Sequence, residues 1–296
     1  MRNNPTNLNT VLFGGVTNYG EGTFYVSART NGVTNNVVII RSTGIVETAT
    51  RVIEVEVRMT PFTPGQVQAD GAMGIYGTNT ELTVSGNSKI DGNDWNLPST
   101  IGNNDEILSG NLTNPGIFYT STTTVFDIQK INSIIGNPPR TNGVGTNSET
   151  LLYQFLASII PYASTNLANL GTRLAPRITM LPMGETKFSG NQNGAGILII
   201  PGKASLKISG TFDYEGLVIL EGDGVIDDDL TQIGTARIFG AMICVGGALE
   251  INFKGTADLK YSTQALANLA NIKNLQEVPA QLDMISWKEI KASSTN

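Results

Sequence analysis

The stretch LKISGTFDYEG, from Leu206 to Gly216, decides the fold that this sequence predicts. Apolar residues alternate up to Ile208, Ser-Gly follows, and a second glycine stands six positions after the first. The same phrase runs from Val84 to Gly92 and from Phe188 to Gly196. A stacked structural unit recurs in this way and a catalytic loop does not. We interpret each Ser-Gly as a corner, where a residue without Cβ can take a positive φ, and the residues after it as an edge of the stack.

Three wholly apolar runs support a stack of parallel strands. They begin at residues 197, 217 and 241, with spacings of 20 and 24 residues that suit one turn of a parallel β-helix. We expect Ile197, Ile199, Leu217, Ile219, Met242 and Ile243 to lie in or beside one continuous core, with strands about 4.8 Å apart. Strands that are apolar on both faces must be covered on both, so we expect a helix on the outer face.

The N-terminal region has a different pattern. Residues 22–59 read as an antiparallel meander, in which Val52, Val55 and Val57 belong to an alternation of apolar and charged residues. Pro61 and Pro64 end this region.

Helical spacing appears at three places. Apolar residues at 125, 128, 131 and 135 predict a helix over about 123–135. The run Thr146-Asn147-Ser148-Glu149 has capping-box spacing and opens a second helix that Pro161 ends. A helical tail is predicted from Thr263 to Leu275. We expect the first two helices to pack their apolar faces on the stack, because that many Ile and Leu side chains would otherwise aggregate.

The composition argues against an enzyme and against nucleic-acid binding. The 296 residues include no histidine, which removes the commonest general base and metal ligand. Charged residues make up 15% of the chain and the net charge is −6, without the basic stripe of a nucleic-acid-binding protein. Cys244, the one cysteine, lies in an apolar run and is interpreted as a buried small residue.

The densest acidic cluster lies between Glu221 and Asp229. Four of its carboxylates form a candidate Ca²⁺ site, since clustered carboxylates at a turn suit a hard cation: Asp223, Asp227, Asp228 and Asp229. A solvated acidic loop is the simpler interpretation of the cluster. A third interpretation is catalysis by paired aspartates, as in some β-helix glycosidases. The run Asp91–Trp95 is a smaller candidate, for a cation or for a sugar stacked on Trp95, with a turn plugged by an aromatic side chain as the alternative.

Several stretches together resemble PilX-type minor pilins, which are components of type IV pili. The resemblance rests on Gly194–Gly202, Leu206–Gly210 and Gly216–Leu220, on Ile75–Gly77 leading to Ser85–Trp95, and on Tyr261-Ser262 with the closing Ile285–Glu289. The strands of the N-terminal meander resemble those that precede this region in such pilins.

The resemblance implies a mainly β protein in three parts. These are a pilin-like β-sheet region over 1–64, a parallel β-helix, or β-solenoid, over 65–262 with a helical insertion at about 123–170, and a C-terminal helix and tail over 263–296. It implies an extracellular subunit of a pilus, with other pilin subunits as partners and no catalytic residues. Membrane contact is expected only through an N-terminal hydrophobic helix, which such pilins have and this sequence lacks.

From these observations we expect a non-enzymatic structural or adhesive protein that binds a polysaccharide or surface receptor through the β-solenoid, with no cofactor apart from the candidate Ca²⁺. Two alternatives stay open. A polysaccharide-active β-helix enzyme would need a groove with paired carboxylates, and a self-polymerising solenoid would need flat, uncapped terminal coils.

Overall fold

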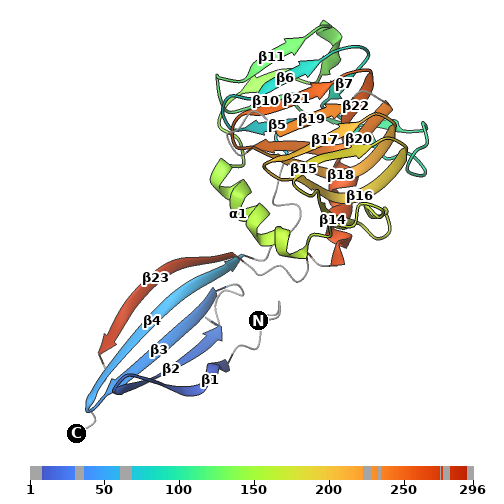
Figure 1. Ribbon diagram of the computed structural model, residues 1–296. Helices are drawn as coiled ribbons and strands as arrows, with labels where there is room; N and C mark the ends of the chain where they lie inside the picture. The colour runs from blue at the N-terminus through green and yellow to red at the C-terminus, as the bar shows by residue number, and fades with distance from the viewer. Residues whose placement is uncertain are drawn as a thin grey trace. The chain divides into compact units, whose positions relative to one another are not determined.

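The computed structural model describes residues 9–30, 37–60, 69–222, 228–232, 235–273, 275 and 281–291 (Figure 1). The protein is mainly β and divides into two compact units. Unit 1 comprises residues 1–62 together with 276–296, and unit 2 comprises residues 63–275. Among the helices in these ranges, none is long and apolar enough to cross a bilayer.

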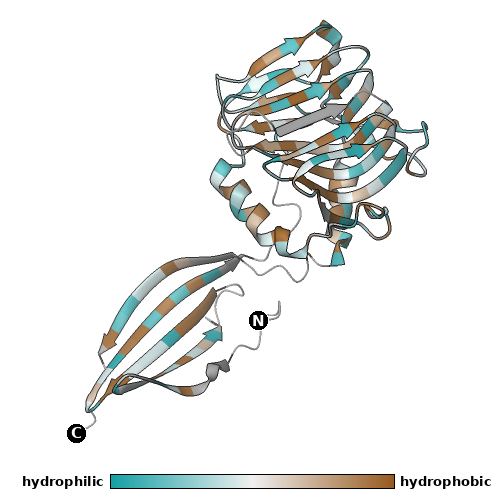
Figure 2. Cartoon of the chain, in the orientation of Figure 1, coloured by the Kyte–Doolittle hydropathy of each residue, from teal (hydrophilic) through white to brown (hydrophobic). Residues whose placement is uncertain are grey.

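Unit 1 is a five-stranded antiparallel sheet with the order β1-β2-β3-β4-β23. Its strands are β1 (Asn9–Tyr19), β2 (Gly22–Thr30), β3 (Val37–Val46), β4 (Ala49–Thr60) and β23 (Gln281–Lys291). The predicted meander is confirmed as β2, β3 and β4, and the alternation of apolar and polar residues is visible along β4 in Figure 2. The prediction of a helix and tail for the last residues is wrong for 281–291, which pair with β4 as an edge strand.

Unit 2 is built from two large parallel sheets, between which the chain passes alternately. The larger sheet has the order β12-β7-β22-β20-β18-β16-β14, with β5, β10 and β13 extending it beside β20. The smaller sheet has the order β11-β6-β21-β19-β17-β15.

The strands of the larger sheet are β5 (Met73–Tyr76), β7 (Lys89–Asp91), β10 (Ile117–Tyr119), β12 (Ile134–Ile135), β13 (Arg140–Asn142), β14 (Arg177–Met180), β16 (Asn191–Ile200), β18 (Thr211–Glu221), β20 (Thr235–Val245) and β22 (Thr256–Tyr261). Those of the smaller sheet are β6 (Glu81–Val84), β11 (Val125–Ile128), β15 (Gly184–Phe188), β17 (Ala204–Ile208), β19 (Asp228–Gln232) and β21 (Leu249–Phe253).

The predicted stacking of the apolar runs is confirmed. Ile197 pairs with Leu217 and Leu217 with Ala241, each in a parallel ladder. Alternate residues of the runs, such as Leu198 and Val218, face the core between the two sheets. The other members are equally buried on the opposite, outer face of the larger sheet, where α1 (Glu149–Ile159) contacts β20.

The levels of the stack do not follow the order of the chain. The N-terminal strands β5, β6 and β7 pair with the C-terminal strands β20, β21 and β22. The chain therefore enters the middle of the stack and builds outward to β13. After α1 it resumes at the opposite end, at β14, and builds inward until β22 meets β7.

The helix predicted over 123–135 is wrong. That segment forms β11, a 3₁₀ turn η3 (Ile131–Ser133) and β12, because β6 and β7 supply parallel partners for its backbone. The second predicted helix is confirmed as α1, although its N-cap is Ser148, whose hydroxyl accepts a hydrogen bond from the Leu151 amide. The tail contains a short helix α2 (Thr263–Ala267) and a 3₁₀ turn η5 (Asn268–Asn271), with Ser262 as the cap of α2.

A column of glycines explains the second glycine of the repeated phrase at Gly196 and Gly216. Gly196, Gly216 and Gly240 stack in register and have φ values of 131°, 139° and 134°. A Cβ on Gly216 would lie 2.0 Å from the carbonyl oxygen of Gly196, so no side chain fits between these levels. The prediction of a positive φ at the Ser-Gly corners is confirmed at Gly86, where φ is 71°, and is wrong at Gly190 and Gly210. A Cβ on Gly210 would instead meet the Gly190 oxygen at 2.2 Å.

Candidate functional site

Opposite charges alternate across four strands on the outer face of the larger sheet. Asp213 on β18 is in register with Arg237 on β20, Arg237 with Asp258 on β22, and Asp258 with Lys89 on β7. These four residues form what we call the charge ladder. Opposite charges on neighbouring strands stabilise one register and disfavour a slipped one.

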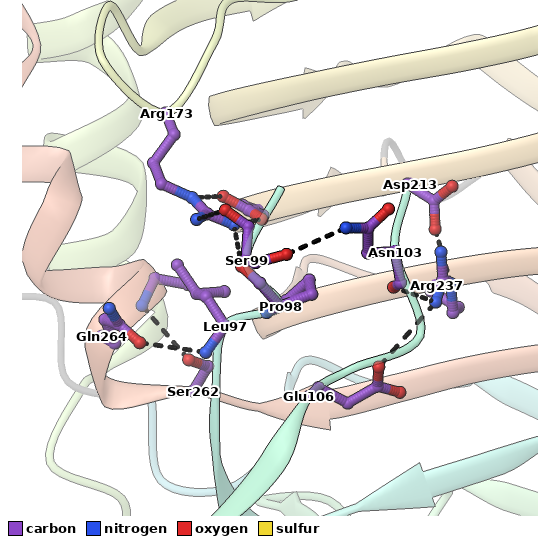
Figure 3. Close-up of polar contacts among 12 residues, drawn as sticks. Leu97, Pro98, Ser99, Asn103, Glu106, Arg173, Asp213, Arg237, Ser262 and Gln264 are labelled. Atoms are coloured by element: carbon purple, nitrogen blue, oxygen red, sulfur yellow. Dashed lines mark hydrogen bonds and ion pairs between the residues drawn. The ribbon is translucent and has the colours of Figure 1, made fainter. Parts of the chain in front are cut away.

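The segment of residues 97–106, the covering loop, joins β8 (Asn93–Asn96) to β9 (Ile107–Thr113) and lies beside Arg237 of the ladder (Figure 3). The Arg237 guanidinium donates from Nε to Asp213 Oδ1 at 2.6 Å and from Nη1 to the Asn103 carbonyl oxygen at 2.7 Å. Lys260 Nζ donates to Glu106 Oε1 at 2.6 Å. Arg237 of the ladder and the neighbouring Lys260 therefore fix the covering loop to the sheet.

Arg173 fastens the other end of the covering loop. Its Nε donates to Glu215 Oε2 at 2.8 Å, and its Nη2 donates to the Pro98 carbonyl oxygen at 2.8 Å (Figure 3). Glu215 is almost fully buried, and its hydrogen bond raises the pKa of the Arg173 guanidinium. One guanidinium thus neutralises a buried carboxylate and anchors loop backbone at the same time.

Two carboxyl groups beside Lys260 are shifted in opposite directions. Burial raises the pKa of Glu106, but the hydrogen bond and charge of Lys260 outweigh it, so the net pKa is lowered. Burial raises the pKa of Asp258, and the charges of Lys260 and Lys89 do not fully offset it. Environments that push two carboxyl pKa values apart are also found in acid–base pairs, so this geometry bears on the enzyme alternative.

A cleft of about 340 Å³ opens beside Asp258. Its lining is polar: Asn87, Ser88, Lys89, Lys130, Asn132, Ser133, Thr256 and Asp258. Glu106 does not line this cleft. Lys260 lies between the two carboxyl groups, with its Nζ 2.6 Å from Glu106 Oε1 and 3.9 Å from Asp258 Oδ2. A molecule in the cleft would meet one carboxyl group and two lysines rather than a pair of facing carboxylates.

The cluster Asp91–Trp95 is integrated into the fold. Asp91 accepts hydrogen bonds from the Asn93 amide at 2.9 Å and from Trp95 Nε1 at 3.2 Å. Asp94 accepts from the Thr263 amide at 2.8 Å and from Ser109 Oγ at 2.9 Å. The Trp95 ring packs against the apolar cluster under α2, with Lys260 Nζ 4.7 Å from its centroid. This arrangement matches the alternative of a turn with an aromatic plug.

The candidate Ca²⁺ residues are only partly within the described ranges. Asp223 and Asp227 lie outside them, and Asp228 and Asp229 begin strand β19. Among the described residues, no three His, Cys, Asp or Glu side chains are grouped as a metal site. The Ca²⁺ site stays a prediction, to be checked by the Ca²⁺ dependence of thermal melting in the native chain and in Asp228→Asn.

Sequence reasoning missed the charge ladder and Arg173, which anchors the covering loop. The signal lay in the repeat itself, because Asp213, Arg237 and Asp258 fall at equivalent positions of successive levels. Aligning the levels through the apolar runs would have put these charges side by side.

Comparisons with known proteins place the chain in no family. No family model matches it, and no curated protein matches it. Among solved structures, the competence-associated pilin ComZ from Thermus thermophilus aligns over 95% of this chain and 87% of its own, with 9% identity and a TM-score of 0.24. A likeness this weak does not decide the fold or the function.

Proposed function

We propose that this protein is a non-enzymatic, extracellular structural or adhesive subunit of a type IV pilus-like filament. In this proposal the parallel stack of unit 2 is a β-solenoid that carries the binding surface, and unit 1 is the pilin-like head that joins other subunits. The stretches that resemble PilX-type minor pilins lie in both units, which supports assigning both to one such subunit.

The ion pairs that join the larger sheet to the covering loop are the observation that carries the proposal. Asp213, Glu215 and Glu106 each bind an arginine or lysine, and those cations also fix the covering loop. Buried charges used in this way hold a rigid surface and are not available to a substrate. A stack held in register by the Asp213–Arg237 ion pair and by the glycine column suits a scaffold that must present one fixed face.

The enzyme alternative is weaker because the described lining of the cleft holds one carboxyl group and not two. Asp258 has the raised pKa of a general acid. A glycosidase also needs a second carboxyl across the bond, about 5–5.5 Å away for retention or about 6.5–9.5 Å for inversion. The described lining of the cleft supplies only Asp258.

Two measurements test the proposal. Antibodies raised against the purified chain should label intact cells and sheared filaments of the organism that makes it. The purified chain, assayed with acidic and neutral polysaccharides beside Asp258→Asn and Asp228→Asn, should show no turnover. Label confined to the cell interior would refute the filament assignment, and turnover lost in either variant would refute the non-enzymatic one.

A further inference from the structure

A second cleft, of about 400 Å³, lies at the β14 end of the stack. It is formed by η4 (Ile160–Tyr162), β14 and the residues around the end of η5. The described lining is Tyr162, Ser164, Leu174, Ala175, Pro176, Arg177, Ile178, Asn271, Ile272 and Lys273. Its volume falls within the range of roughly 300–1,000 Å³ that is usual for small-molecule sites.

The charge of this cleft is opposite to that of the protein. Arg177 and Lys273 are exposed, neither has an ion-pair or hydrogen-bond partner among the described residues, and no acidic side chain is part of the described lining. Elsewhere in unit 2, Arg173, Arg237 and Lys260 are paired with carboxylates. Two cations in one concave site that have no partner among the described residues, in a chain with net charge −6, favour an anionic ligand there.

The rest of the lining indicates what carries the anion. Leu174 is 95% exposed, and with Pro176 and the Tyr162 ring it gives an apolar wall, which suits the C–H face of a sugar ring. Ser164 and Asn271 add a hydroxyl and an amide that can hydrogen-bond sugar hydroxyls. Arginine presents a planar fork that matches a carboxylate, and lysine adds a point charge beside it.

We propose that this cleft binds a carboxylate-bearing sugar unit of an acidic polysaccharide. The inference deepens the proposed adhesive function and rests on it for its biological setting, whereas the binding itself rests on the cleft alone. Arg177 pairs with the sugar carboxylate, Lys273 adds a second positive charge, and the apolar wall holds the ring.

The test uses the full chain and isothermal titration calorimetry with tetramannuronate as the probe. The matched neutral probe is β-1,4-mannotetraose, in which a hydroxymethyl group replaces each carboxylate. The double variant Arg177→Gln/Lys273→Gln should bind tetramannuronate at least about tenfold more weakly than the native chain, with an unchanged melting temperature. The control Lys207→Gln/Lys254→Gln removes the same charge elsewhere in unit 2 and should bind as the native chain does.

Each arm separates the proposal from another explanation. Equal affinity for mannotetraose, equal losses in the control variant, or no binding of tetramannuronate would overturn it. Sodium sulfate that displaces tetramannuronate better than sodium chloride of equal ionic strength would show a general anion site and overturn the carboxylate assignment. A chain that binds tetramannuronate but is found inside cells would refute the proposed function and leave this site standing.

Discussion

Replacing Gly216 by alanine should destabilise unit 2 more than most single substitutions do. The new Cβ would lie 2.0 Å from the Gly196 carbonyl oxygen, at a φ of 139° that side-chain-bearing residues rarely adopt. Real Cβ atoms essentially never approach within 3.0 Å of such an atom, so β16 and β18 must separate by about 1 Å at this level. Backbone hydrogen bonds between the two strands, which are normally near 2.9 Å, are lost at that separation.

The cost has two parts. Two or three weakened backbone hydrogen bonds at about 1 kcal/mol each, and a positive φ at about 1–2 kcal/mol, together give a loss of about 3–5 kcal/mol in the free energy of unfolding. Domains of this kind are stable by only about 5–15 kcal/mol, so the variant should unfold at a much lower urea concentration.

The two tryptophans of the chain allow each unit to be followed separately, because Trp95 lies in unit 2 and Trp287 in unit 1. Urea unfolding is measured by Trp95 fluorescence in a Trp287→Phe background. Gly190→Ala is the matched control: it lies at a corner of the same stack, lacks a positive φ, and a Cβ there meets no atom within 4 Å. If Gly216→Ala and Gly190→Ala differ by less than about 1 kcal/mol, the proposed role of the glycine column is wrong.

Three further outcomes are expected. Arg237→Gln leaves Asp213 buried without its cation and should cost about 3 kcal/mol and speed subtilisin cleavage of the covering loop; unchanged cleavage would contradict the role given to the ladder. The Lys288 hydrogen bond lowers the pKa of Glu54 below its usual 4.5, so its contribution to unit 1 is complete above pH 4.5 and is lost as pH falls through the lowered value. In Glu54→Gln, unit 1 should lose less stability at acid pH than in the native chain, as followed by Trp287 fluorescence. An unchanged loss of stability would exclude Glu54 as its source. Burial raises the pKa of the Cys244 thiol, so Ellman's reagent should react only as fast as unit 2 unfolds, and rapid labelling of the native chain would refute that burial.

The stack was predictable because its signal is local and repeated. Each level needs one apolar run and one glycine where strands approach closely, and both are visible at Ile197–Ile200 and Leu217–Leu220. The meander of unit 1 was predictable for the same reason, since alternation along β4 reports its two faces directly.

The errors arose where the partner strand is distant in the sequence. Apolar residues from Val125 to Ile135 have helical spacing, yet two short strands and a corner produce the same spacing by chance. Their partners lie about 44 positions earlier, because β8, β9 and the covering loop extend that level. Strand β23 was missed likewise, since its partner β4 precedes all of unit 2.

That placement of β23 couples the two units through the chain itself. Closing the sheet of unit 1 requires Gln281 to meet Thr60 across roughly 220 intervening residues, and the entropic cost of a flexible closure grows as (3/2)RT ln n. When unit 2 is folded it holds its own ends at a fixed separation. The loop to be closed then contains far fewer flexible residues, so n is much smaller. Unfolding unit 2 should therefore cost unit 1 about 2 kcal/mol of closure entropy through the chain connection alone.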